Sequence, residues 1–220
     1  MSRLVRTLAV AGFAVAFLAA CSLPLPEPIE LEGGIFGLDG VEVELAAIAP
    51  ASIAPLATTG FSGQIDEAYD VAAGDIPAGL QNLFTVASID EEVGLGVNLT
   101  LTSAEELPAS FTVTAATLTN VVVQKGTQTI FTGDFSSVAG GTMTFSRAGV
   151  CTGVCAYTAS ATTALVDVSL TGSVADDLAT EIIEGGSFTV TADFAVTVNP
   201  ALPDDTAISA VLVSLGAVLE

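Results

Sequence analysis

The chain has no histidine among its 220 residues. Histidine is the base in Ser-His-Asp and Cys-His catalysis, a common ligand of zinc, copper and haem iron, and the usual proton shuttle near neutral pH. The sequence therefore excludes these catalytic classes and excludes metal centres ligated by histidine. With Lys125 and Arg147 the only basic side chains beyond residue 6, nucleophilic catalysis by serine or threonine also has little support.

Basic and large aromatic residues are scarce as well. The chain has four Lys and Arg against 25 Asp and Glu, no Trp and two Tyr. A surface this acidic repels nucleic acid and disfavours docking to anionic lipid, because both kinds of binding need Lys and Arg. The lack of aromatic platforms argues against a glycosidase built on paired carboxylates. The charge instead favours solubility, cation binding or a basic partner.

The N-terminal segment has the organisation of a secretory signal. Arg3 and Arg6 precede Leu8–Leu18, eleven residues without a polar side chain, and small residues follow. A basic region, a short apolar region and small residues before a cleavage site are typical of such signals. The apolar run is shorter than the roughly 20 residues that a membrane-spanning helix needs.

The ending of that segment, Leu18-Ala19-Ala20-Cys21, resembles the lipobox of bacterial lipoproteins. The resemblance implies a cleaved signal peptide of residues 1–20 and fatty acyl chains such as palmitate on Cys21. It places the protein outside the cytoplasm, anchored to a membrane of the cell envelope, and several acyl chains anchor stably. Ser22 implies sorting to the outer membrane in a cell that has one. The processed chain would keep two basic side chains against 25 acidic ones, a balance of −23.

A tether and one domain are expected after the cleavage site. Pro24, Pro26 and Pro28 alternate with other residues, a pattern that favours a semi-rigid extended spacer. We therefore interpret residues 21–40 as the lipidated cysteine with a proline-rich tether, and residues 41–220 as one folded domain. The repeated Ile-Ala-Pro of residues 48–56 predicts an extended surface connection.

Alternating apolar and polar residues predict that the domain is all-β. The clearest strand is Ser187–Val198, where Phe188, Val190, Ala192 and three further apolar residues occupy every second position. Val41, Val43 and Leu45 alternate in the same way. Similar strands are predicted at Asn82–Ile89, Leu95–Ser103, Ser110–Val123, Thr127–Phe135, Gly141–Arg147, Ala156–Thr163 and Ala164–Thr171. The apolar spacing of Ala207–Leu219 also fits a helix, but the surrounding strands and the preceding turn favour a final strand. About ten strands with frequent turns predict an antiparallel β-sandwich of the immunoglobulin-like type.

One short helix is expected near residues 174–184. Ser173 can cap its start, Asp176 falls in the first turn, and Gly185 can end it. The apolar side chains of Val174, Leu178 and Ile182 share one face of this helix.

Cys151 and Cys155 are the two cysteines that remain beside the anchor. In an oxidising compartment their spacing favours a structural disulfide that closes a tight loop. A pair of free thiols and a redox-active pair are the alternatives, although the spacing is one residue longer than in the usual redox motif and no neighbouring cation lowers a thiol pKa. Two thiolates alone lack the other ligands of a zinc site.

Acidic residues gather at expected turns, such as Asp90-Glu91-Glu92 and Asp204-Asp205. Calcium takes six to eight oxygens that converge from loops. The weak candidates for such a site are Asp66, Asp70, Asp75, Asp204 and Asp205, and no calcium-binding loop motif is present. Solvated turn charges are the alternative interpretation.

These observations predict a protein that is not an enzyme and has no cofactor other than a possible calcium ion. The expected role is structural or protein-interacting, with the membrane contacted through the lipid and an envelope protein as partner. A surface module that binds calcium or a small ligand is the first alternative. A hydrolase that uses carboxylates alone is the second.

Overall fold

The structure is a computed structural model that describes residues 23–24, 29–30, 34–48, 58–71, 84–95, 99–103, 105–137, 141–159 and 163–219. Its strands are β1 (Leu23–Pro24), β2 (Ile29–Glu30), β3 (Glu42–Ala47), β4 (Thr59–Val71), β5 (Phe84–Thr85), β6 (Ser88–Leu95), β7 (Leu99–Thr102), β8 (Ser110–Lys125), β9 (Gln128–Ser136), β10 (Met143–Arg147), β11 (Val154–Ala159), β12 (Ala164–Thr171), β13 (Gly186–Asn199) and β14 (Ala207–Leu219). Within the described ranges α3 (Ser173–Glu184) is the single helix. The predicted all-β, sandwich-like fold with one short helix is confirmed.

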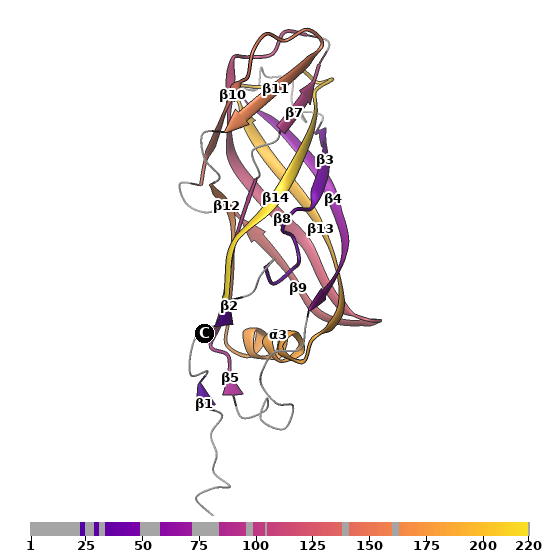
Figure 1. Cartoon of the computed structure of the whole chain (residues 1–220), viewed down its shortest axis with the longest axis vertical. Helices are drawn as coiled ribbons and strands as arrows, with labels where there is room; N and C mark the ends of the chain where they lie inside the picture. Colours follow the sequence, from indigo (N-terminus) through magenta and orange to yellow (C-terminus); the bar gives the residue numbers. More distant parts are fainter. Residues whose placement is uncertain are drawn as a thin grey trace, which may run out of the picture.

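Twelve strands form one antiparallel sheet that curls around a common core (Figure 1). The hydrogen-bonded path runs β12-β6-β14-β3-β4-β13-β8-β10-β11-β7, with β2 added beside β14 and β9 beside β8. At the end of this path β7 returns to β14, where Leu101 lies opposite Ile208. The sheet therefore closes on itself at that end, and its two walls face each other across the apolar interior. A separate two-stranded sheet pairs β1 with β5 in parallel.

The core follows from the period of two that the sequence shows. In β13 the alternate residues Phe188, Val190, Ala192, Phe194, Val196 and Val198 are all buried, as predicted. β4 and β8 pair with its two edges along most of its length, so its outward-facing side chains are partly covered too. The predicted final strand is also present, and β14 contacts four other strands.

Two acidic stretches that were expected to be turns are strands. Asp66 and Asp70 lie on β4, and β6 runs through Asp90, Glu91 and Glu92. In β4 the exposed side chains of Gln64 and Asp66 flank the buried side chain of Ile65. Charged residues were mistaken for turn residues because their side chains lie on the solvent face of strands whose other face is apolar.

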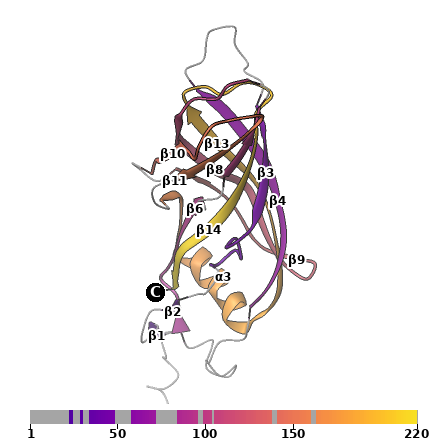
Figure 2. The same ribbon diagram turned by 45° about the horizontal axis from the view of Figure 1, so that its top comes forward.

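The helix α3 closes the lower end of the molecule, and Figure 2 shows it seated between the strands there. Its buried residues are Ala175, Leu178, Ala179 and Ile182. The predicted cap at Ser173 is wrong: Gly172 is the N-cap, with no side-chain hydrogen bond, and Ser173 is the first helical residue. Gly172 has φ +68°, a conformation that glycine adopts without strain. The predicted end at Gly185 is correct.

Part of the expected tether belongs to the domain. Ile35, Phe36 and Leu38 are almost completely buried, although they lie within residues 21–40. Nearer the N-terminus, Ile29 pairs with Leu219 at the end of β14. The proline-rich segment is therefore joined to the large sheet at β2, whereas β1 pairs with β5 in the separate small sheet. The Ile-Ala-Pro connection at 49–57 lies outside the described residues.

Candidate functional site

The residues considered for calcium lie in different parts of the fold. Asp66 and Asp70 are on the exposed face of β4, whereas Asp204 and Asp205 form the turn before β14. Asp75 lies outside the described residues. The Ser103 hydroxyl donates to Asp205 Oδ1 over 3.3 Å. This contact fixes that carboxylate at the end of the molecule opposite α3, called the upper end below.

The distance along β4 separates the two pairs. Thr59 begins β4 and exchanges hydrogen bonds of 3.1 and 2.9 Å with the carbonyl and amide of Leu202, two residues before Asp204. Asp66 is seven residues further along, or about 23 Å at the usual rise of a strand. Over the part of the chain that is described, no three His, Cys, Asp or Glu side chains are grouped as a metal site requires. The structure does not bring these candidates together.

A polar hollow of about 360 Å³ lies on the outer face of β4, β13 and β8, around Asp193. Its carboxylate accepts hydrogen bonds from the Gln64 amide over 3.3 Å and from the Asn120 amide over 2.7 Å. Asn120 has φ +52° in a bulge of β8, and its backbone N–H donates to Asp134 Oδ1 over 2.6 Å. Both Asp193 oxygens are thus held by neutral amides. The hollow offers hydrogen-bonding groups but pairs no nucleophile with a base.

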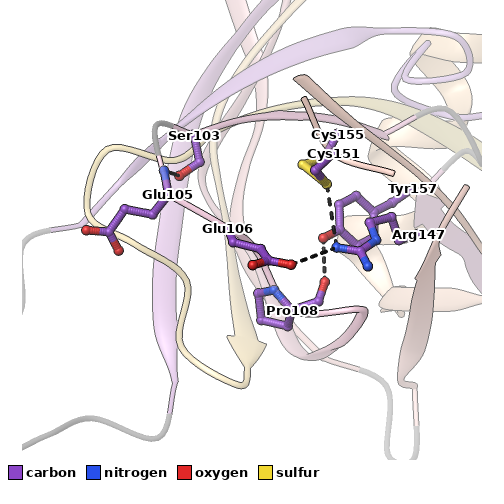
Figure 3. The surroundings of a disulfide bond; sticks show 8 residues. All are labelled: Ser103, Glu105, Glu106, Pro108, Arg147, Cys151, Cys155 and Tyr157. Carbon is purple, nitrogen blue, oxygen red and sulfur yellow. Dashed lines mark hydrogen bonds and ion pairs between the residues drawn. A yellow bond between two sulfur atoms is a disulfide. The ribbon is translucent and has the colours of Figure 1, made fainter. Parts of the chain in front are cut away.

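At the opposite end from α3, a disulfide closes the loop between β10 and β11, as predicted (Figure 3). The Cα atoms of Cys151 and Cys155 are 4.8 Å apart. Cys155 is buried at the start of β11, whereas Val150 and Val154 are 87% and 58% exposed. The disulfide therefore fastens an apolar loop tip to the sheet and leaves that tip in water.

The base of this loop is packed on Tyr157. Its hydroxyl donates to the carbonyl oxygen of Pro108, and its ring meets the edge of Phe111 with centroids 5.2 Å apart. Burial raises the pKa of the Tyr157 phenol, an effect that the positive charge of Arg147 partly opposes. Arg147 in turn lies 3.9 Å from a carboxylate oxygen of Glu106. Figure 3 shows Tyr157, Arg147 and Glu106 near the disulfide.

Lys125, at the end of β8, links this strand to α3 at the lower end of the molecule. Its ammonium group donates to Glu181 Oε2 over 2.9 Å, to Glu184 Oε2 over 3.2 Å and to the Glu181 carbonyl over 3.2 Å. It also lies 5.6 Å from the centre of the Phe188 ring. Burial alone lowers the pKa of Lys125, but the hydrogen bonds and charges of the two glutamates outweigh it, so the pKa lies above its ordinary 10.5. This cation completes the last turn of α3, which has no basic residue of its own.

Cys21 lies outside the described residues, but β1, the first described strand after it in the sequence, is placed near α3. β1 pairs with β5, and just after β5 the N–H of Val86 donates to Asp176 Oδ1 in the first turn of α3 over 2.9 Å. β1, the described element closest in sequence to the expected anchor, therefore lies at the end of the molecule that carries α3.

Two features of these ends were not found from the sequence. No prediction was made for the exposure of Val150 and Val154, because the sequence between two expected strands does not show where the sheet ends. The contacts of Lys125 were missed because its partners lie 56 and 59 positions away. The scarcity of cations was the available indication, since two basic side chains among so many acidic ones are expected to be paired.

In comparisons with protein-family models, with curated proteins and with solved structures, nothing matches this chain. Among the described residues no helix is long and apolar enough to cross a membrane.

Proposed function

We propose that this chain is a lipid-anchored extracytoplasmic protein with a non-catalytic structural or protein-interaction role in the cell envelope. Cys21 carries the lipid, and Ser22 directs the protein to the outer membrane in a cell that has one. The observation that carries the proposal is the lipobox-like Leu18–Cys21 two residues before β1. Pairing of β1 and β2 with the domain supports it, because the anchor then leads directly into the folded sheet.

The chemistry of the described residues favours a non-catalytic role. Titratable groups that make directed contacts are held by structural partners: Asp193 by amides, Asp176 by a backbone N–H, and Lys125 by glutamates. The absence of histidine agrees with this interpretation. The separation of Asp66 from Asp204 gives a calcium site no support.

The test is to follow processing of the full chain in cells given labelled palmitate. We expect label on the wild-type protein, a mature form that starts at Cys21, and sedimentation with membranes. Cys21→Ala should lose the label and the cleavage, whereas Cys151→Ala, which removes a different cysteine, should keep both. An unlabelled wild-type protein released in soluble form would contradict the proposal.

A matched pair of variants at residue 22 tests sorting between the inner and outer membranes. In a cell with two membranes, Ser22→Asp should hold the lipidated protein in the inner membrane, and Ser22→Thr should leave it in the outer membrane. The measurement is the distribution of the protein over separated membranes. Identical distributions of the two variants would contradict the sorting proposal while leaving the anchor intact.

A further inference from the structure

The loop 148–153 and the first residue of β11 carry the most solvent-accessible large apolar side chains of the described chain. Val150 and Val154 are 87% and 58% exposed, whereas the next residues, Ile48 and Val174, are each 49% exposed. Single exposed apolar residues are ordinary on protein surfaces. Here two of them lie close together in the chain at the end of the sheet, Val150 in the loop and Val154 at the start of β11, and burying such side chains against a partner is favourable at about 25 cal/mol per Å² of apolar surface.

The loop has its shape before any partner arrives. The Cys151–Cys155 disulfide closes it, and at its base the N–H of Ala148 donates to the carbonyl of Ala156 over 2.8 Å. Gly149 and Gly153 have φ +106° and +94°, which lets the chain turn sharply around the two valines. A loop fixed in this way loses little conformational freedom on binding, so more of the contact energy appears as affinity.

Carboxylates lie at the same end of the molecule, to one side of the loop. Val154 lies opposite Thr102 in the sheet, and next to it Ser103 hydrogen-bonds both the N–H of Glu105 and Asp205 Oδ1. The side chains of Glu105, Glu106, Asp204 and Asp205 are exposed at this end. Arg147 is the cation found among them, and its guanidinium lies 3.9 Å from Glu106. The surface is an apolar tip beside a group of negative charges.

We propose that this surface, formed by Val150, Val154 and the carboxylates of Glu105, Glu106, Asp204 and Asp205, docks a basic protein segment that carries an apolar side chain. The inference rests on the proposed function, because the anchor fixes the α3 end at the membrane. The loop then projects away from the membrane, separated from α3 by the 14 residues of β13, about 45 Å of strand.

Charge selects the partner. Anionic lipid and nucleic acid are repelled by the four carboxylates. A second copy of this chain, docked through the same surface, would bring eight like charges together and is disfavoured for the same reason. A segment with Lys or Arg beside an apolar residue satisfies both halves of the surface.

The test places a photo-crosslinking amino acid at Val150 of the full-length lipoprotein in living cells. The matched control places it at Val174, an exposed valine on α3 at the opposite end. We expect one protein adduct from position 150, absent from position 174, in which the crosslinked peptide of the partner has a net positive charge. If the substitution at Val150 reduces accumulation of the protein, the same measurement is made at Val154.

Variants that remove negative charge test whether the carboxylates take part in docking. The double change Glu105→Gln with Glu106→Gln should lower the adduct yield about tenfold at low salt, because complementary charges steer association. Asp66→Asn with Asp177→Asn removes the same charge elsewhere and should leave the yield unchanged.

Four outcomes would overturn the inference: no protein adduct at either loop position, an adduct with lipid or a second copy, an equal adduct at Val174, or a yield insensitive to the glutamate changes. A palmitate label on the same samples reports the anchor separately. A labelled protein without the adduct refutes docking alone, whereas an unlabelled protein refutes the proposed function.

Discussion

The two ends of the molecule are held by different means. At the lower end Lys125 joins a strand to α3 through two carboxylates and a carbonyl, all within 3.2 Å. At the upper end Arg147 makes one looser ion pair at 3.9 Å, and a covalent disulfide fastens the loop. Beyond residue 6 the chain has two basic side chains, one at each end of the molecule. The comparison shows that the basic residue of the lower end stabilises contacts within the fold. At the upper end the disulfide holds the loop, and apolar and acidic side chains are exposed there.

The largest loss of stability is expected from a substitution in the core next to the upper end. Phe145 is fully buried and stacks on Phe111 with centroids 5.1 Å apart. Phe145→Ala should lower the free energy of unfolding by about 3–5 kcal/mol, because it removes apolar contacts and leaves a cavity. Urea unfolding measures the change, and Phe145→Leu should lose clearly less. A cost of Phe145→Ala below about 1 kcal/mol would show that the upper end is not packed as described.

Removal of the disulfide should cause the second largest loss of stability. Replacing Cys151 and Cys155 together by alanine should lower the free energy of unfolding by roughly 2 kcal/mol, because the unfolded chain regains the freedom that a short closed loop removes. Reductant should destabilise the wild-type protein by a similar amount and leave the double variant unaffected. An equal response of both proteins to reductant would mean that the two cysteines are not joined.

Lys125→Met tests the cation of the lower end. We expect a loss of about 1 kcal/mol near neutral pH, since ion pairs open to solvent contribute little each. Lys125→Arg should retain most of the stability. The pKa of Lys125 is raised in the folded state, so its contribution is complete below pH 10.5, the ordinary pKa, and is lost as pH rises through the folded value.

The stabilities of wild type and Lys125→Met should therefore converge above that pH. The raised pKa of Tyr157 also destabilises the fold in alkali, but it acts equally in both proteins and cancels from the comparison. A difference that persists in strong alkali would mean that packing of the lysine stem, and not its charge, stabilises this end.

The smallest effect is expected at the tip of the loop. Val150→Ser should change the free energy of unfolding by less than about 0.5 kcal/mol, because the side chain is 87% exposed. Thermal unfolding of the two proteins measures this. A larger loss would mean that Val150 supports the fold, which would weaken the case for a docking surface there.

Strands in which apolar and polar residues alternate cleanly were predicted from the sequence. A strand whose outer face carries several acidic residues was missed. β12 was predicted with its observed bounds, and the buried face of β13 was predicted residue by residue. β4 was missed because Asp66, Glu67 and Asp70 resemble turn residues until β13 is seen to pair with them. Pairing between distant segments is decided by the whole sheet, so a local pattern cannot reveal it.

The candidate site was less predictable than the fold. The disulfide follows from the spacing of Cys151 and Cys155, but the exposure of Val150 depends on where the sheet ends. The grouping of Glu105 with Asp205 depends on a contact through Ser103 that spans 102 positions. The calcium candidates failed for the same reason in reverse, because residues expected in neighbouring loops lie apart, Asp66 and Asp70 on the strand β4 and Asp204 and Asp205 in the turn before β14.

The place of β14 in the sheet sets the order in which this protein can fold. β14 pairs with β2, β3, β6 and β7, all of which precede it by long stretches of chain. None of those pairings can form until residue 207 has been made, on the order of ten to thirty seconds after β3 at typical rates of synthesis. Contacts this distant in sequence also form slowly. The sheet thus cannot close around its core until the C-terminal strand has been made.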